Sequence, residues 1–137
     1  VVLSEKGGAF IEMLRPIRLF IGSPLGSGEQ YIPWIHIDDI CAIYIKAIED
    51  QSMSGVYNAV SPEHVTNRYF TKITAKILGR PLIMPNVPAF LLKFLFGEMA
   101  SVVLKGSRAS CKKLEDTGYV FKYDKLHKAL EALLKKD

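Results

Sequence analysis

The sequence predicts an α/β fold made of a few, mainly parallel strands with helices, followed by a small helical lobe. Strand-like and helix-like patterns alternate through residues 1–84, whereas residues 85–137 contain only helical patterns. The content of 49% hydrophobic and 23% charged residues is ordinary for a globular domain with one core. We therefore expect residues 1–84 to be the end of a larger sheet domain and residues 85–137 to be a helical domain.

The beginning of the chain predicts strands separated by a short helix. The apolar run Val1–Leu3, followed by Gly7-Gly8, is typical of the end of a buried strand whose partners lie upstream, so we expect a fragment of a longer protein. Residues 9–14 would form one or two helical turns before a proline. The composition of residues 17–21 predicts a strand, and three glycines and a proline predict a loop at residues 22–28.

A strand over residues 31–37 and an amphipathic helix are expected next. Asp38 or Asp39 can cap this helix, because a carboxylate accepts hydrogen bonds from free backbone N–H groups and is favoured by the helix dipole. The spacing of apolar residues predicts a buried helical stripe. Its members are Ile40, Ile43, Tyr44, Ala47 and Ile48.

Another strand and a well-delimited helix follow. Residues 55–60 read as a short apolar strand, and Thr66 or Asn67 would begin the next helix. Gly79 suits the end of that helix, and residues 81–84 favour a further short strand. The stripe expected to be buried consists of Phe70, Ile73, Ile77 and Leu78.

The rest of the chain predicts short helices. Pro88 suits the first turn of a helix that runs to Phe96, and further helices are expected at residues 99–104 and 111–117. The last helix would start at Asp124. Its apolar stripe consists of Leu126, Leu130, Leu133 and Leu134.

Composition argues against several kinds of partner. The net charge of +4 comes from dispersed lysines without a dense basic run, so we expect no nucleic-acid binding. No segment reaches the roughly 18 consecutive apolar residues of a membrane helix, so we expect no membrane partner. Cys41 and Cys111 lack metal-site spacing and favour buried or partly buried free thiols in a reducing compartment such as the cytoplasm. No metal site is expected, because the three histidines are scattered.

The densest group of functional side chains follows the glycine-rich loop. On a strand over residues 31–37, Trp34, His36 and Asp38 would share one face, since alternate side chains point the same way. An indole, an imidazole and a carboxylate could wall a polar ligand with a flat or ribose-bearing part. The alternative is that His36 is hydrogen-bonded for structure and that Asp38 only caps the helix.

The glycine-rich loop could present backbone N–H groups to an anion, but it lacks the phosphate-loop pattern with its lysine. A plain turn between two strands is the alternative.

Four segments together resemble one branch of the NAD-dependent epimerase/dehydratase family, within the extended short-chain dehydrogenases. Residues 22–30 read Gly-Ser-Pro-Leu-Gly-Ser-Gly-Glu-Gln, and residues 33–39 read Pro-Trp-Ile-His-Ile-Asp-Asp. Residues 55–62 and 65–67 add to the resemblance, which covers nearly the whole chain and includes the C-terminal domain of that branch.

The resemblance implies a Rossmann-type domain that binds NAD or NADP and a smaller lobe that holds the substrate. This chain would be the substrate-binding C-terminal fragment of an NAD(P)-dependent nucleoside-diphosphate-sugar epimerase or a related oxidoreductase. The glycine-rich cofactor turn and the Tyr-x-x-x-Lys pair of that superfamily do not occur in this sequence. We therefore assign no catalytic residue, and we expect the fragment to be inactive and to bind no cofactor on its own.

The resemblance also directs attention to specific side chains. We expect Gln30, Trp34, His36 and Arg108 to contact a small-molecule substrate, with Asp38 holding the segment in place. The planar fork of an arginine suits a phosphate group, because it can donate two charge-assisted hydrogen bonds at once. The alternative for Arg108 is an ordinary surface residue.

A non-enzymatic protein-interaction module is the rival interpretation of the whole chain. The apolar surface of Val1–Leu3 and a truncated sheet edge would then recruit a partner or a second copy of the chain.

Overall fold

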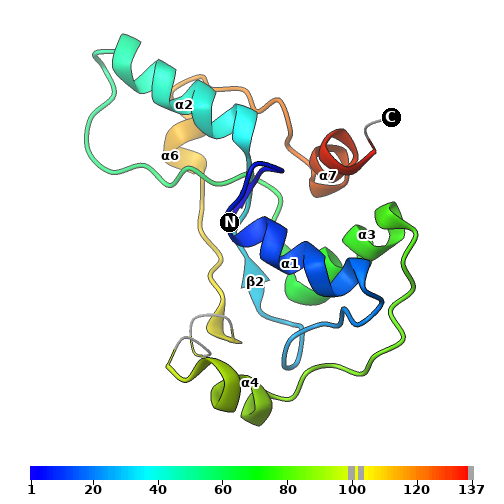
Figure 1. Cartoon of the computed structure of the whole chain (residues 1–137). Coiled ribbons are helices and arrows are strands. Elements are labelled where there is room, and N and C mark those ends of the chain that lie inside the picture. Colours follow the sequence, from blue (N-terminus) through cyan, green and yellow to red (C-terminus); the bar gives the residue numbers. More distant parts are fainter. Residues whose placement is uncertain (99–100, 102–103, 136–137) are drawn as a thin grey trace.

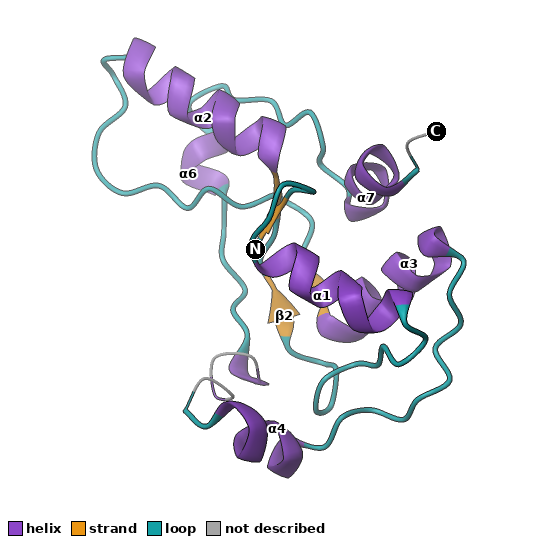
Figure 2. Ribbon diagram, in the orientation of Figure 1, coloured by secondary structure: helices purple, strands orange, loops and turns teal. Residues whose placement is uncertain are grey.

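The computed structural model describes residues 1–98, 101 and 104–135. Helices surround a small number of short strands, and the chain spreads from α2 at one end to α4 at the other (Figures 1 and 2). The elements are β1 (Val2–Leu3), α1 (Ala9–Arg18), β2 (Tyr31–Ile32), β3 (Ile35–His36), α2 (Ile37–Glu49), β4 (Val65–Thr66), α3 (Asn67–Leu78), α4 (Ala89–Phe96), α6 (Lys112–Glu115) and α7 (Leu126–Leu134).

The strands form two pairs. β1 runs parallel to β3, with Leu3 opposite His36, and β2 runs antiparallel to β4, with Tyr31 opposite Thr66. A single parallel bridge joins Leu25 to the segment before α4. The α/β prediction of few strands with helices is confirmed.

One hydrophobic core joins the two ends of the chain. α7 packs against α3, and α3 packs against α1, so residues from the last part of the sequence lie beside residues from the first. The fully enclosed members of this core come from β1, α1, the β2–β3 connection, β4, α3 and α7. They are Leu3, Phe10, Leu14, Trp34, Val65, Phe70, Leu126, Ala129, Leu130 and Leu133.

The prediction of a strand at residues 17–21 is wrong, because α1 continues through Pro16 to Arg18. Phe10, Leu14 and Ile17 are spaced by four and three residues, and all three are buried. This helical spacing places one continuous stripe against the core, and it outweighs the local strand preference of the isoleucines.

The predicted strand over residues 31–37 is divided into β2 and β3, and helix α2 already begins at Ile37. Pro33 lies between the strands and has no N–H group to donate to a strand ladder.

The strand predicted at residues 55–60 is also absent from the described structure. Carbonyl groups of Ser54 and Val56 accept hydrogen bonds from the Lys113 ammonium group, at 3.2 and 2.9 Å, instead of from a neighbouring strand. The strand expected at residues 81–84 is absent as well, and most of that segment is exposed.

The predicted helices are largely confirmed. The Thr66 hydroxyl caps α3 by accepting from the Tyr69 N–H at 3.2 Å, and Gly79 ends that helix with a φ of 67°. α4 follows Pro88, and α6 and α7 lie where the sequence predicts them. The helix predicted at residues 99–104 falls partly outside the described residues. No helix in the described part of the chain is long and apolar enough to cross a lipid bilayer.

The two cysteines are free but differ in their surroundings. Cys111 is buried, whereas Cys41 is exposed, contrary to the expectation that both would be at least partly buried. Burial, together with the hydrogen bond from the Cys111 thiol to Glu115 and the charge of that carboxylate, raises the pKa of Cys111 to about 11. The Cys111 thiol is therefore unsuited to act as a nucleophile near neutral pH.

We predict that iodoacetamide at pH 8 alkylates Cys41 and spares Cys111, since a pKa of about 11 keeps Cys111 in its unreactive thiol form. Mass spectrometry of the tryptic peptides measures both sites in one sample. Labelling of Cys111 in the folded protein at a rate equal to that in 6 M guanidinium would contradict this assignment.

Two glycines with similar backbone angles form a matched pair for a stability test. Gly79 has a φ of +67° and Gly106 a φ of +63°, but an added Cβ would meet nothing within 4 Å at Gly79 and would lie 2.3 Å from the Tyr31 carbonyl oxygen at Gly106. Gly79→Ala should cost about 1 kcal/mol from backbone conformation alone. Gly106→Ala should cost about 1–3 kcal/mol more because of the clash. Urea unfolding of both variants measures the difference, and equal losses would show that the loop at Gly106 is not held against β2.

Candidate functional site

An open hollow lies at the carboxyl ends of the parallel strands β1 and β3. Its volume is about 530 Å³, which is within the range of small-molecule sites. In open α/β sheets, ligands bind outside the carboxyl ends of the strands, where the following helices begin. The residues that line the hollow are Val2, Ser4, Lys6, Gly7, Gly8, Ala9 and Ile37.

The hollow is bordered by the first residues of two helices. Ala9 begins α1 and Ile37 begins α2, and the residue that precedes α1 is Gly8, which makes no side-chain cap bond. A Cβ added at Gly7 or Gly8 would meet no atom within 4 Å, so space beside this backbone is open. With the nearby Lys6 ammonium group, these features suit a polar or anionic ligand group.

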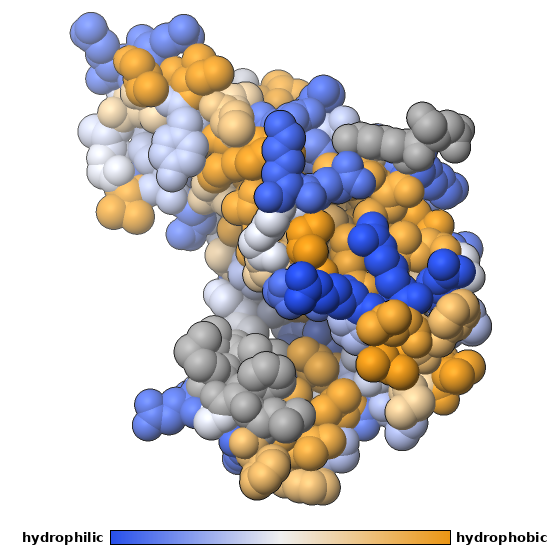
Figure 3. Space-filling view, in the orientation of Figure 1, coloured by the Kyte–Doolittle hydropathy of each residue, from blue (hydrophilic) through white to orange (hydrophobic). Residues whose placement is uncertain are grey.

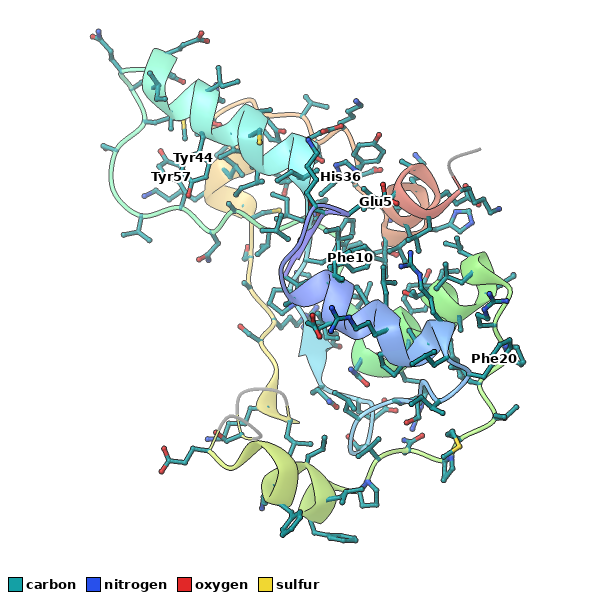
Figure 4. All side chains as sticks on the ribbon, in the orientation of Figure 1. Glu5, Phe10, Phe20, His36, Tyr44 and Tyr57 are labelled. Atoms are coloured by element: carbon teal, nitrogen blue, oxygen red, sulfur yellow. The ribbon has the colours of Figure 1, made fainter. Side chains whose placement is uncertain are left out.

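His36 caps the N-terminus of α2, directly after β3. Its imidazole is 3% exposed, and Nδ1 accepts a hydrogen bond from the Asp38 N–H at 3.0 Å. The ring also stacks on Tyr123, with 4.0 Å between ring centroids. Figure 4 labels His36 at the start of α2. The His36 ring is therefore buried and hydrogen-bonded, as in the structural interpretation of this residue made from the sequence.

Trp34 and Gln30 are buried, and neither lines the hollow. Trp34 is 1% exposed in the main core, and its indole N–H donates to the Glu63 carbonyl at 3.1 Å. The Gln30 side-chain amide donates to the Leu25 carbonyl at 3.0 Å. The prediction that Trp34 and His36 share one face with Asp38 required a continuous strand over residues 31–37. Pro33 divides that strand.

Arg108 lies on the surface beside β2. Its Nε donates to His64 Nδ1 at 2.7 Å, and the guanidinium carbon lies 5.5 Å from the centroid of the Tyr31 ring. These three side chains line a cavity of about 10 Å³, which is room for roughly one water molecule. No described residue lines both this cavity and the hollow, so Arg108 lines a different cavity from the residues at the carboxyl ends of β1 and β3.

Two neighbouring carboxylates lie at the start of α2, and Asp39 is the buried one; the supporting role expected of Asp38 stays a prediction. Asp38 is exposed and forms an ion pair with Lys122 at 3.3 Å, whereas Asp39 is 1% exposed. Asp39 accepts hydrogen bonds from the Tyr119 hydroxyl at 2.6 Å and from the N–H groups of Lys122 and Tyr123 at 2.8 and 3.0 Å.

Sequence reasoning could have singled out Asp39. Asp39 precedes Ile43 by four residues and therefore lies on the apolar stripe of α2, which is an unusual place for an unpaired carboxylate. Burial raises the pKa of Tyr119 above its ordinary range, and the hydrogen bond to the Asp39 carboxylate and its charge act in the same direction. The phenol therefore remains a proton donor to Asp39 near neutral pH.

The hollow was also missed from sequence, although a signal existed. A short apolar strand, two glycines and a helix follow one another at the start of the chain, which is the order found where a strand end meets a ligand. The described residues contain no group of three or more His, Cys, Asp or Glu side chains arranged to hold a metal ion.

The chain is similar to a described family and to several known proteins. Residues 87–133 match the family described as Domain of unknown function (DUF1731). The chain is 40% identical over 132 residues to the epimerase family protein SDR39U1 of Mus musculus, covering 96% of this chain and 45% of that protein.

Two solved structures are similar to the whole chain. The human epimerase family protein SDR39U1 (isoform 2), crystallised with NADPH, matches with a TM-score of 0.91 and 36% identity over 98% of this chain and 46% of that one. The nucleoside-diphosphate sugar epimerase of Corynebacterium glutamicum matches with a TM-score of 0.70 and 32% identity over 98% of this chain and 24% of that one. This chain spans less than half the length of each of these relatives. The resemblance inferred from residues 22–39 is confirmed, and the chain corresponds to the C-terminal part of the epimerase family proteins.

Proposed function

We propose that this chain is the substrate-side part of an NAD(P)-dependent nucleoside-diphosphate-sugar epimerase or a related oxidoreductase. The observation that carries the proposal is the hollow at the carboxyl ends of β1 and β3, at the position where α/β proteins bind nucleotides. The NADPH bound by the human relative and the name of the Corynebacterium relative, a nucleoside-diphosphate sugar epimerase, support it.

The hollow fits one polar end of such a ligand. Gly7, Gly8 and Ala9 leave space beside the backbone, and the α1 N-terminus and Lys6 favour carbonyl or phosphate oxygens. When bound, a nicotinamide cofactor would supply hydride transfer, and these residues would bind and orient a ligand group beside it. The chain alone lacks the glycine-rich turn and the Tyr-x-x-x-Lys pair, so it is proposed to be inactive without the half of the protein that carries them.

Arg108 is proposed to contact substrate from a second position. The Arg108 cavity includes Pro33, before β3, and the hollow includes Ile37, after β3. Ile37 follows Pro33 by four residues, and four residues of extended chain span at most about 13 Å. One elongated nucleotide-sugar could therefore reach both the hollow and the Arg108 cavity. Its phosphate would accept from the exposed guanidinium, while the buried Gln30, Trp34 and His36 hold the strands between the two positions.

A reducing compartment such as the cytoplasm is proposed for the protein. The support is chemical, because both cysteines are free and one of them is exposed to solvent.

The interaction-module alternative rests on the outer face of α2. Tyr44 and Ile48 belong to the stripe predicted to be buried, yet they are 67% and 82% exposed, and Ile45 beside them is 56% exposed. Figure 3 shows apolar surface over this helix, and Figure 4 labels Tyr44 on it. The edge residues Val1 and Val2 are also partly exposed. Such a face favours contact with another protein surface, including a second copy joined at the sheet edge.

We predict that filling the hollow blocks ligand binding. In a full-length protein that carries this chain, Ala9→Trp should weaken NADPH binding at least about tenfold, because the indole occupies the space beside Gly8. Ala42→Trp is the matched control, since Ala42 is an exposed helical alanine away from both cavities. Titration followed by NADPH fluorescence measures both variants. Wild-type affinity in a folded Ala9→Trp protein would refute the placement of the site.

The interaction-module alternative predicts that the chain associates with itself through the outer face of α2. If the α2 face mediates self-association, light scattering of the chain should give a dimer mass that Ile48→Glu converts to a monomer mass, because a charge in an apolar interface is costly to desolvate. A monomer mass for the unmodified chain at high micromolar concentration would count against self-association.

A further inference from the structure

The segment that precedes α7 is fastened to the first turn of α2 by one buried carboxylate. Asp39 Oδ1 accepts from the Tyr119 hydroxyl and from the Lys122 N–H, and Oδ2 accepts from the Tyr123 N–H. We call Asp39 with these three residues the Asp39 clamp. A buried carboxylate remains charged only where donors surround it, and the clamp supplies three of them.

The clamp closes a ring of contacts around the start of α2. The backbone of Tyr123 is bonded to Asp39, the Tyr123 ring stacks on His36, and His36 Nδ1 accepts from the Asp38 N–H. The Tyr123 carbonyl also accepts from the Ser61 hydroxyl at 3.4 Å. Three of these four contacts involve Tyr123, which is about 80 residues further along the chain than α2.

This ring reaches the hollow through two neighbouring residues. His36 lies opposite Leu3 in the β1–β3 pair, and Ile37, the next residue, lines the hollow. The His36 side chain accepts from the Asp38 N–H in the first turn of α2 and so holds the backbone on either side of Ile37. Without Tyr123 behind it, the His36 ring would lose the stacked surface that holds its orientation.

We propose that Asp39 is a positioning residue for the ligand site: it holds Tyr123 against His36 and thereby couples docking of residues 119–134 to the shape of the hollow. The inference rests on the proposed function, because it takes the hollow as the place where the ligand binds. Coupling is reciprocal, so a ligand in the hollow should in turn stabilise the docked C-terminal segment.

The chain offers closely matched variants for the test. Asp39→Asn keeps one oxygen for Tyr119 and Lys122 but turns an NH₂ group toward the Tyr123 N–H. Asp38→Asn removes the same charge from the same helical turn, and the Asp38 carboxylate is exposed, 3.3 Å from Lys122 Nζ and 3.9 Å from His36 Nδ1. Tyr119→Phe removes a single hydroxyl and serves if Asp39→Asn fails to fold.

Two measurements are made on the full-length protein, at a temperature where circular dichroism shows every variant folded. The first is the affinity for NADPH, and the second is amide hydrogen exchange with and without NADPH. Asp39→Asn should weaken NADPH at least about tenfold and Tyr119→Phe about threefold, with Asp38→Asn within twofold of wild type. NADPH should slow exchange of residues 119–134 in wild type and not in Asp39→Asn. Unchanged affinity in folded Asp39→Asn and Tyr119→Phe proteins would overturn the inference.

The outcomes separate this inference from the proposed function. If Ala9→Trp weakens NADPH and the clamp variants do not, the hollow binds the ligand and only the positioning role of Asp39 is wrong. If Ala9→Trp leaves NADPH binding unchanged, the proposed site itself is wrong, and the inference falls with it.

Discussion

The arrangement of the molecule depends on the buried charge of Asp39. Its carboxylate lies on the inner side of α2, where a charge without partners would be strongly destabilising, and donors from residues 119–123 satisfy it. These donors hold the segment that precedes α7 against the start of α2. Leu126, Leu130 and Leu133 of α7 are buried in the same core as residues of α1 and α3, so the last helix packs against the first part of the chain.

The two candidate contact regions lie at opposite ends of β3. The hollow lies after the strand, beside two helix starts, and the Arg108 cavity lies before it, beside β2. Buried Trp34 and His36 occupy the connection between them and are held by hydrogen bonds. A ligand that engages both regions must therefore be elongated, whereas a compact ligand would use the hollow alone. The exposed face of α2 is a separate surface, and neither cavity includes it.

Sequence patterns predicted the helices well and the strands poorly. α2, α3 and α7 carry repeated apolar spacing and, in α3, a threonine cap and a terminal glycine, which are local signals. The strands contain two residues each, and their pairing is decided by distant partners that a local pattern does not contain. Distant partners also explain why the burial of the candidate site residues was not predicted. His36 and Trp34 were recognised as important, but their burial depends on Pro33 dividing the strand and on Tyr123 and Glu63, far along the chain. Asp39 differed from Asp38 only in its helical position, which was available from the sequence.

We propose that the ligand binds in the hollow at the carboxyl ends of β1 and β3. The most direct test is an NMR titration of NADPH into an isotope-labelled, full-length protein that carries this chain. If the ligand binds there, the amide signals of Lys6, Gly7, Gly8 and Ile37 should shift first and most, at ligand concentrations near the Kd. Shifts confined to the surroundings of Tyr31, His64 and Arg108, with the hollow unchanged, would contradict it.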